Sequence, residues 1–422
     1  MRRRSFSIIS LGCFRNTYDS EIVAKRYVDK GYMLKEKAEK VDLLIINTCG
    51  FIKEAKEESI EAIEAAIDWK RKNKVGEILV KGCLVERYRD KLERYFPEVD
   101  KWEGVEDFPK KFVEREKLTP FYIDFLKICE GCANKCSYCA IPQIKGTLKS
   151  RPVEEIIKEA KELDKKGVKE LNIIGQDITS WGKDLPFNYE KSPFKGKDLV
   201  YLLKKILKET KNIPWIRLLY THPKNFSDSL LDLIANEERI CKYVDLPIQH
   251  INNRILKYMN RQTTKEEIIS LIEKIRKKVP EVCIRTSIIV GFPGETEDEF
   301  KELVKFITEV KFERLGAFIY SPEENTPAYN LKGRVHYKTK KRRYDELMRI
   351  QREISHQVNK KFLDKKLAVL VEEETDGFFI GRTEFSAYQI DGEVFLKRKN
   401  LKIGDFYEAK IIEALEYDLI GE

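Results

Sequence analysis

The pattern of hydrophobic and polar positions divides the chain into three parts. From residue 5 to about 100, short apolar runs typical of strands alternate with amphipathic stretches of helical period. Alternation of this kind predicts an open parallel sheet with helices on both faces. The expected strands are Ser5–Leu11, Val41–Asn47 and Glu77–Lys81, and the expected helices are Asp19–Lys30, Lys53–Lys72 and Glu86–Tyr95.

A charged segment with two prolines, residues 101–120, is typical of a linker, and a longer α/β series follows it. About six βα units in roughly 210 residues predict a partial (βα)6 barrel rather than a complete eight-stranded one. The expected strands are Phe121–Ile128, Glu170–Ile174, Trp215–Tyr220, Tyr243–Leu246, Cys283–Val290 and Arg314–Tyr320. The expected helices between them are Val153–Lys166, Asp198–Thr210, Thr264–Lys278 and Thr296–Val310.

From about residue 362 the apolar period falls to two, and glycines interrupt it at 377, 381, 392 and 404. This pattern predicts a small antiparallel β-barrel of about 60 residues. The sequence therefore predicts an α/β protein with an N-terminal sheet domain (1–100), a linker (101–120), a partial-barrel core (121–358) and a C-terminal barrel (359–422).

Composition indicates a globular protein that keeps its thiols reduced. The chain is 42% hydrophobic, and no apolar run approaches the roughly 20 residues that a membrane span requires. Its N-terminus lacks the apolar length and the cleavage site of a signal peptide, so we expect a cytoplasmic protein without membrane contact. In that compartment the nine cysteines are more suited to metal binding or catalysis than to disulfides.

Three widely separated cysteines each follow a predicted strand. Cys13 lies in "LGCFRN", Cys49 in "NTCGF" and Cys83 in "KGCLVE". The carboxyl ends of parallel strands line one edge of a sheet, so we expect the three thiols to meet there. Three thiolates without a fourth protein ligand suit an iron–sulfur cluster that has one open iron. The alternative is three buried thiols that cap their strands, because free cysteine is often buried.

Four further cysteines lie within "CEGCANKCSYCAIP", residues 129–142. Their gaps are too short for two zinc knuckles, and their order differs from a ferredoxin run. The spacing Cys132-x3-Cys136-x2-Cys139 is instead that of the cluster loop in radical S-adenosylmethionine enzymes. Three thiolates hold a [4Fe-4S] cluster and leave one iron for the amino and carboxylate groups of S-adenosylmethionine. Cys129 is left over, either as a bystander thiol or as a substitute ligand.

Polar groups at other predicted strand ends suit a cofactor cradle. They lie in "IIGQD", "DLPIQH" and "RTSIIVGFPGET", whose glycines allow close backbone approach. His250, in the second stretch, has the alternative of a structural role, and Cys241 and Cys283 are expected in the core. The predicted contacts of S-adenosylmethionine are Tyr138, Gln176, Asp177, Gln249, Arg285 and Gly291.

Two sets of three cysteines and a terminal β-barrel resemble the radical S-adenosylmethionine methylthiotransferases, over essentially the whole chain. The resemblance also rests on "SLGCFRNTYDSE", "YSPEENTPAYNL", "GRTEFSAYQIDGEVF" and "EYDLIGE". It implies an N-terminal cluster domain, a radical barrel and a TRAM domain. Phe14–Arg15 stands where the family usually has Pro-Lys, and Cys129 stands where it has serine.

The resemblance further implies two [4Fe-4S] clusters, with S-adenosylmethionine as both methyl donor and radical source. The auxiliary cluster would be bound by Cys13, Cys49 and Cys83, and the radical-generating cluster by Cys132, Cys136 and Cys139. One S-adenosylmethionine would methylate sulfur on the auxiliary cluster, and a second would yield the radical that abstracts hydrogen from the substrate carbon. No catalytic residue beyond the cluster ligands is implied, because the cofactors supply the difficult chemistry.

The quoted motifs most resemble the branch of this family that modifies the β-carbon of an aspartate in ribosomal protein S-twelve. Two alternatives remain: a tRNA adenosine methylthiotransferase of the MiaB-like branch, and a non-enzymatic electron carrier or RNA-binding scaffold.

The charge of the C-terminal segment favours a protein substrate over tRNA. Residues 362–422 hold 14 acidic against 8 basic residues, a net charge of −6, although the whole chain carries +9. Phosphate binding needs Lys and Arg, whereas an acidic module attracts a basic ribosomal protein. Within this C-terminal segment, we expect the acidic cluster at Glu372, Glu373, Glu374 and Asp376.

Overall fold

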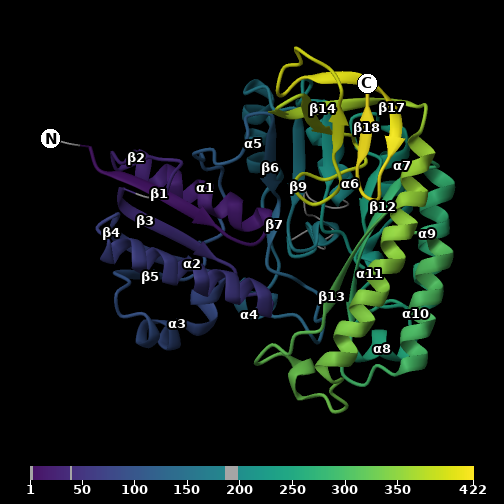
Figure 1. The fold of residues 1–422 in the computed structure, drawn as a ribbon, viewed down its shortest axis with the longest axis horizontal. Helices are drawn as coiled ribbons and strands as arrows, with labels where there is room; N and C mark the ends of the chain where they lie inside the picture. Colours follow the sequence, from purple (N-terminus) through teal and green to yellow (C-terminus); the bar gives the residue numbers. More distant parts are fainter. Residues whose placement is uncertain (1–2, 39, 186–197) are drawn as a thin grey trace, which may run out of the picture.

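In the computed structural model, which describes residues 3–38, 40–185 and 198–422, the chain folds into three consecutive bodies (Figure 1). An open sheet covered by helices is followed by a partial βα barrel, and a small closed β-barrel ends the chain. The α/β class and the order of the three architectures confirm the sequence prediction. No helix among the described residues is both long and apolar enough to cross a membrane.

The N-terminal body is a five-stranded sheet in which every neighbouring pair is parallel. Its strands, in the order β2-β1-β3-β4-β5, are β1 (Ser5–Ser10), β2 (Met33–Leu34), β3 (Val41–Thr48), β4 (Val75–Gly82) and β5 (Lys101–Glu103). Its helices are α1 (Phe14–Asp29), α2 (Lys53–Arg71) and α3 (Cys83–Tyr95). Alternate residues of β3 face opposite sides: Leu43 and Ile45 join the core with α1, whereas Leu44 and Ile46 join the core with α2 and α3.

The segment that the sequence predicts as a linker, residues 101–120, begins inside this sheet. Strand β5 pairs with β4, so the N-terminal sheet extends to residue 103. The rest of the segment lies against α1 and the barrel. Glu116 N donates to Glu21 O of α1, and Arg115 forms ion pairs with Glu21 and with Asp124 of the barrel.

The central body has six strands in two parallel sheets, ordered β10-β9-β6 and β11-β12-β13. A parallel bridge between Ile216 and Ile240 joins the two sheets. The strands are β6 (Ile123–Lys127), β9 (Glu170–Ile174), β10 (Trp215–Leu218), β11 (Tyr243–Asp245), β12 (Cys283–Val290) and β13 (Arg314–Ile319). The six strands confirm the predicted partial barrel.

Helices cover the outside of this barrel because each places an apolar stripe against it. In α10, Phe300, Leu303 and Phe306 are buried, and Thr296 closes a capping box with Glu299. The helices are α5 (Val153–Lys165), α6 (Leu199–Glu209), α7 (Asp228–Asn236), α8 (Asn253–Tyr258), α9 (Lys265–Lys278), α10 (Glu297–Val310) and α11 (Tyr337–Asn359). Shorter elements are β7 (Cys129–Glu130), β8 (Lys149–Ser150), α4 (Ile141–Ile144), η1 (Ile178–Ser180), η2 (Pro223–Asn225), η3 (Pro327–Asn330) and η4 (Lys360–Phe362).

The C-terminal body is a closed barrel ordered β14-β15-β16-β18-β17. Its strands are β14 (Lys366–Thr375), β15 (Phe378–Arg382), β16 (Val394–Leu396), β17 (Phe406–Ala414) and β18 (Leu419–Gly421). The expectation of a purely antiparallel barrel is corrected at one place, because β16 and β18 pair in parallel. This barrel sits over the amino ends of the central strands (Figure 1). Trp215, at the start of β10, packs against Phe406, and Glu170, at the start of β9, pairs with Arg382.

The predicted acidic cluster of the C-terminal barrel is divided by the fold. Glu372 lies on β14 rather than in a turn, and its carboxylate pairs with the buried Arg382 at 2.6 Å. Arg382 also bonds Glu170, which in turn bonds Arg217 of the central barrel. Glu372 therefore anchors the C-terminal barrel and is not part of a free acidic surface; the exposed members are Glu373, Glu374 and Asp376.

Candidate active site

Three cysteines lie at the carboxyl ends of neighbouring strands in the N-terminal sheet. Cys13 precedes α1 as its N-cap after β1, Cys49 follows β3, and Cys83 follows β4 as the first residue of α3. Strands β1, β3 and β4 are adjacent, which brings the three thiols to one edge. Gly12 has a φ of +88°, and a Cβ there would lie 2.8 Å from Cys49 Sγ, so this close approach requires glycine.

The three thiols are free, and the charge of Cys13 affects the ionisation of the other two. Burial raises the pKa of Cys49 to about 11 and that of Cys83 to about 12, and the charge of Cys13 opposes ionisation of both. Burial also opposes ionisation of Cys13, but the charge and the hydrogen bond of Arg15 bring its pKa below the usual value. The first set thus supplies three sulfur donors at one sheet edge, and Cys13 among them is paired with the cation of Arg15.

The second set lies on the loop after β7, near the carboxyl end of β6. Backbone contacts fix this loop: Cys132 N donates to Gly146 O, and Ser137 N donates to Met259 O. Arg261 Nη1 lies 3.6 Å from Cys136 Sγ. Burial raises the pKa of Cys132 and raises that of Cys139 to about 12, and both thiols are affected by the charge of Cys136.

Arg15, on the first turn of α1, lies between the two cysteine sets. Its Nε donates to Cys13 Sγ at 3.4 Å, and its Nη1 donates to Gly175 O, just after β9, at 3.2 Å. The guanidinium carbon lies 4.4 Å from the centre of the Tyr220 ring, just after β10. The charge of Arg15 favours ionisation of both Cys13 and Cys139, so this side chain acts on one cysteine of each set.

Three of the predicted S-adenosylmethionine contacts lie beside the second set. Asp177 accepts hydrogen bonds from Asn134 Nδ2 of the cysteine loop at 2.8 Å and from Asn225 Nδ2 at 3.1 Å. Gln176 precedes Asp177, and its Oε1 is buried without a hydrogen-bond partner among the described residues. Tyr138 is half-buried and packs against the apolar cluster that includes Phe292. The charges of Cys136 and Arg261 affect its pKa.

The other three predicted contacts are spread along the central barrel. Gln249 adopts a φ of +73° and pairs through its backbone with β12. Arg285 lies near the amino end of β12, where it pairs with Asp245 at 3.1 Å and approaches Asp391 of the C-terminal body at 3.8 Å. A Cβ at Gly291 would lie 2.4 Å from the Lys340 side chain of α11, so that glycine permits helix packing.

The donor atoms of the two cysteine sets suit an iron–sulfur cluster better than a single metal ion. No group of three or more His, Cys, Asp or Glu within the described ranges could hold a single metal ion. A four-iron cluster differs from a single ion, because each thiolate binds its own iron. Near the second set, Gln176 Oε1, Arg261 Nε and Thr263 Oγ1 are buried without partners in the described part of the chain. An acceptor beside two donors suits an ammonium and a carboxylate, so these residues fit a cluster with an amino-acid-bearing ligand.

Two arginines that the sequence prediction does not include each donate toward a cysteine sulfur. Arg15 stands in the sequence only as a departure from the family, although its position two residues after Cys13 and at the start of a helix indicates the contact. Arg261 is 125 positions from Cys136 and has no local motif, so only the fold reveals it. The leftover Cys129 is fully buried beneath Gly175, and Cys241 and Cys283 lie in the core as expected.

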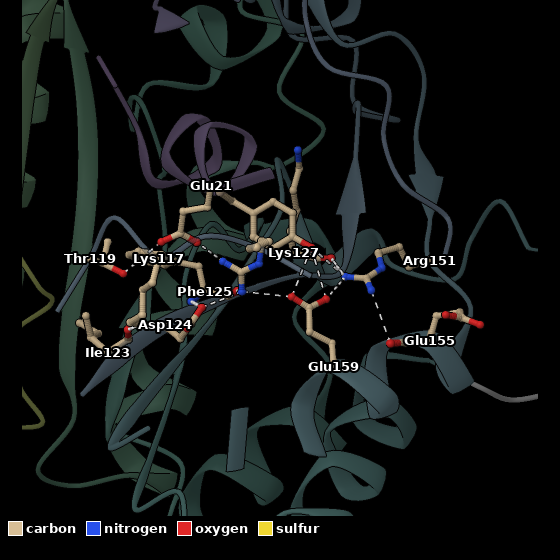
Figure 2. A network of polar contacts seen from close by, with 12 residues as sticks. Glu21, Lys117, Thr119, Ile123, Asp124, Phe125, Lys127, Arg151, Glu155 and Glu159 are labelled. Atoms are coloured by element: carbon tan, nitrogen blue, oxygen red, sulfur yellow. Dashed lines mark hydrogen bonds and ion pairs between the residues drawn. The ribbon is translucent and has the colours of Figure 1, made fainter. Parts of the chain in front are cut away.

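A buried network of charges holds the two cysteine-bearing bodies together (Figure 2). Arg115 of the intervening segment bonds Glu21 of α1, Asp124 of β6 at 2.7 Å and Glu159 of α5 at 3.1 Å. Glu159 also accepts from Arg151 at 2.6 Å. Because buried charges are tolerated only when they are paired and hydrogen-bonded, this network fixes α1, and with it Arg15, against the barrel.

Three family descriptions match consecutive parts of the chain. Residues 5–104 match the uncharacterized protein family UPF0004, residues 126–307 match the Radical SAM superfamily, and residues 365–422 match the TRAM domain. The three matches coincide with the three bodies of the fold. Residues 126–307 include the second cysteine set, and residues 5–104 include the first.

Curated relatives match along the full chain. A protein of Geotalea uraniireducens named "Ribosomal protein uS12 methylthiotransferase RimO" is 41% identical over 100% of this chain and 98% of its own. Proteins of the same name from Clostridioides difficile and Thermoanaerobacter are 42% and 43% identical. The matches cover 98% and 99% of this chain, and 97% and 100% of theirs.

Among solved structures, the radical S-adenosylmethionine methyltransferase TsrM from Kitasatospora setae, with cobalamin and a [4Fe-4S] cluster bound, superposes with a TM-score of 0.55. The match covers 78% of this chain and 77% of that one at 14% identity. At this identity the likeness concerns the fold alone.

Proposed function

Because the chain belongs to the RimO family of ribosomal protein uS12 methylthiotransferases, we propose that it attaches a methylthio group to the β-carbon of an aspartate in uS12, the small-subunit protein S-twelve. The protein is a radical S-adenosylmethionine enzyme that uses an iron–sulfur cluster. The observation that supports the proposal is that Arg15 donates both to Cys13 of the first set of free thiols and to Gly175 O, at the end of β9 in the body that carries the second set.

Each set would hold one [4Fe-4S] cluster, for a total of two. The auxiliary cluster would be bound by Cys13, Cys49 and Cys83, and the radical-generating cluster by Cys132, Cys136 and Cys139. When bound, these clusters and S-adenosylmethionine supply the sulfur and radical chemistry.

The protein's own side chains orient and stabilise these groups. Arg15 and Arg261 direct N–H donors at Cys13 and Cys136, and such donors stabilise thiolates and tune cluster potentials. Asn134 and Asp177 tie the cysteine loop to the end of β9. Gln176 and Thr263 would satisfy their buried polar atoms on the amino-acid end of S-adenosylmethionine. Of the other predicted contacts, Tyr138 lies in the cysteine loop itself, whereas Gln249, Arg285 and Gly291 lie along the barrel and remain predictions.

Iron content tests the proposed count of two clusters. The anaerobically reconstituted protein should hold about eight iron atoms, four for each set of thiols. Replacing Cys132, Cys136 and Cys139 by Ala should halve the iron and abolish 5′-deoxyadenosine formation. The matched control replaces the buried core thiol Cys241 by Ala and should keep both. Unchanged iron in the triple variant would remove the second cluster from the proposal.

The protein substrate is favoured over tRNA by charge. Residues 362–422 carry −6, whereas a module that grips phosphates needs an excess of Lys and Arg. The exposed Glu373, Glu374 and Asp376 suit a basic ribosomal protein. The full-length relatives are named for uS12, so the tRNA alternative is not favoured.

We also propose that the enzyme works in the cytoplasm. The support is chemical: all nine cysteines are free, and both cysteine sets must stay reduced to bind iron. Fractionation of cells followed by immunodetection tests this location, and recovery of the protein outside the cytoplasmic fraction would contradict it.

A further inference from the structure

Arg15 is a half-buried cation that lacks a carboxylate partner. Its hydrogen bonds go to the Cys13 thiol and to a backbone carbonyl, and its flat face covers the Tyr220 ring. None of the ion pairs formed within residues 3–38, 40–185 and 198–422 includes it. The Cys13 sulfur takes only Nε, and a backbone carbonyl takes Nη1, so the guanidinium keeps N–H donors that a negatively charged group can complete.

The carboxylates around Arg15 are already satisfied by other groups. Asp19, on the same helix, binds Lys127 and Lys145 at 2.7 and 2.9 Å. Asp245 binds Arg285 and also accepts from Tyr220 N at 2.7 Å. Asp177 accepts from amide and hydroxyl donors, including Asn134, Thr179 and Ser180. Among the described residues Arg15 therefore has no carboxylate partner and, like Arg261 beside Cys136, is available to an anionic ligand.

We propose that Arg15 binds the side-chain carboxylate of the aspartate that is modified, and that it thereby selects an acidic residue as substrate. The proposal rests on the function proposed above. Arginine suits the role because its planar guanidinium matches a carboxylate with two parallel hydrogen bonds and keeps its charge at all relevant pH values. The β-carbon of aspartate is bonded directly to that carboxylate, so fixing the carboxylate fixes the reacting carbon between the two cysteine sets.

The same contact would discriminate against other substrates. An adenine base is neutral and offers no carboxylate, so it would leave Arg15 without an anion. A site built around a buried charge rejects analogues that lack the matching group, because the charge is then left unpaired. Arg15 is accordingly a specificity-determining residue, whereas the net charge of the C-terminal barrel acts at longer range.

The test is a double-mutant cycle on binding, with full-length, cluster-reconstituted enzyme and purified uS12 in the presence of S-adenosylmethionine but without reductant, so that no turnover occurs. The modified aspartate is first located by mass spectrometry of the wild-type product. Binding of uS12 and of its Asp→Asn form is then measured for the wild-type enzyme and for the Arg15→Met, Arg15→Lys and Arg94→Met variants. Arg94 is an exposed arginine of α3 and serves as the matched control.

We expect Arg15→Met to weaken binding of uS12 about 10- to 100-fold, as for loss of a charged hydrogen-bonded pair. The same Arg15→Met change should alter binding of the Asp→Asn form less than about threefold. The affinity of Arg15→Lys for uS12 should lie between those of the wild-type enzyme and Arg15→Met, because lysine keeps the charge but loses the planar fork. Arg94→Met should bind both forms as the wild-type enzyme does.

If Arg15→Met lost equal affinity for uS12 and for its Asp→Asn form, the assignment would be overturned. Loss of iron in both Arg15 variants, with equal binding defects, would assign Arg15 to cluster retention instead and would also overturn it. Failure of the wild-type enzyme to modify uS12 would contradict the proposed function itself, and is therefore distinguishable from failure of this inference.

Discussion

Arg115 provides the sharpest test of how the two cysteine-bearing bodies are held together. It lies in the segment between them and pairs with three carboxylates that Figure 2 labels, Glu21, Asp124 and Glu159. Each of these carboxylate side chains is at most 6% exposed. Its guanidinium also lies 4.2 Å from the centre of the Tyr18 ring. The Arg115→Met variant keeps much of the apolar stem and removes the charge.

The size of the expected stability loss follows from the hydrogen-bond and ion-pair partners that each carboxylate keeps in Arg115→Met. Asp124 keeps Lys117 at 2.7 Å, and Glu159 keeps Arg151 at 2.6 Å. Glu21 keeps only neutral donors, Leu118 N and Thr119 Oγ1. Removing one partner of a buried pair costs about 3–5 kcal/mol, so we expect a loss of about 4 kcal/mol in the free energy of unfolding, dominated by Glu21. Adding Glu21→Gln should recover roughly half of it, because the unpaired charge is then gone.

The assay is urea unfolding of the full chain, following the first transition. Arg71→Met is the matched control, because Arg71 forms an exposed ion pair with Glu98 and should change stability by less than about 1 kcal/mol. Loosening α1 also displaces Arg15, so the methylthio product formed per S-adenosylmethionine cleaved should fall in Arg115→Met. A change no larger than that of the control, or no recovery in the double variant, would refute the reasoning.

Three further predictions address the clusters, the C-terminal barrel and pH. Replacing the first cysteine set by Ala should spare S-adenosylmethionine cleavage but stop methylthio transfer, as measured by 5′-deoxyadenosine and product; continued transfer would contradict it. Replacing the exposed acidic residues Glu373, Glu374 and Asp376 by Lys should weaken uS12 binding and strengthen tRNA binding in filter assays, whereas tighter uS12 binding would contradict the charge argument. Burial lowers the pKa of His250 to about 4, below about 6.5 in the unfolded chain, so the unfolded state binds more protons and stability falls as pH drops. Between pH 6.5 and 5 the loss should be about 1.6 kcal/mol, seen by urea unfolding, and His250→Asn should reduce that slope; an unchanged slope would refute it.

The fold could be predicted from the sequence because the helices and strands show clear hydrophobic periodicity. Strand β3 is a nearly continuous apolar run, and α10 combines a capping box with an apolar stripe, so periodicity located both within a residue or two. The cysteine loop was found because its spacing is local. The thiols of the first set could be related because parallel strands end at one edge.

What the sequence did not indicate depends on contacts between distant segments. The contact between Arg261 and Cys136 and that between Arg115 and Glu21 arise only when separate elements pack. The same holds for Glu372, whose neighbours suggested an acidic surface but whose partner, Arg382, lies on the next strand. A charge sum over a segment counts such buried pairs as if they were exposed. The parallel pairing of β16 with β18 likewise depends on closure of the barrel.

The most direct test of the central claim is mass spectrometry of a single competition reaction. The reconstituted enzyme is supplied with S-adenosylmethionine, sulfide, a reductant, purified uS12 and unmodified tRNA in equal amounts. We predict that uS12 gains one methylthio group on an aspartate β-carbon while the tRNA stays unmodified. Methylthio-adenosine in the tRNA, or cleavage of S-adenosylmethionine with uS12 left unchanged, would contradict the account.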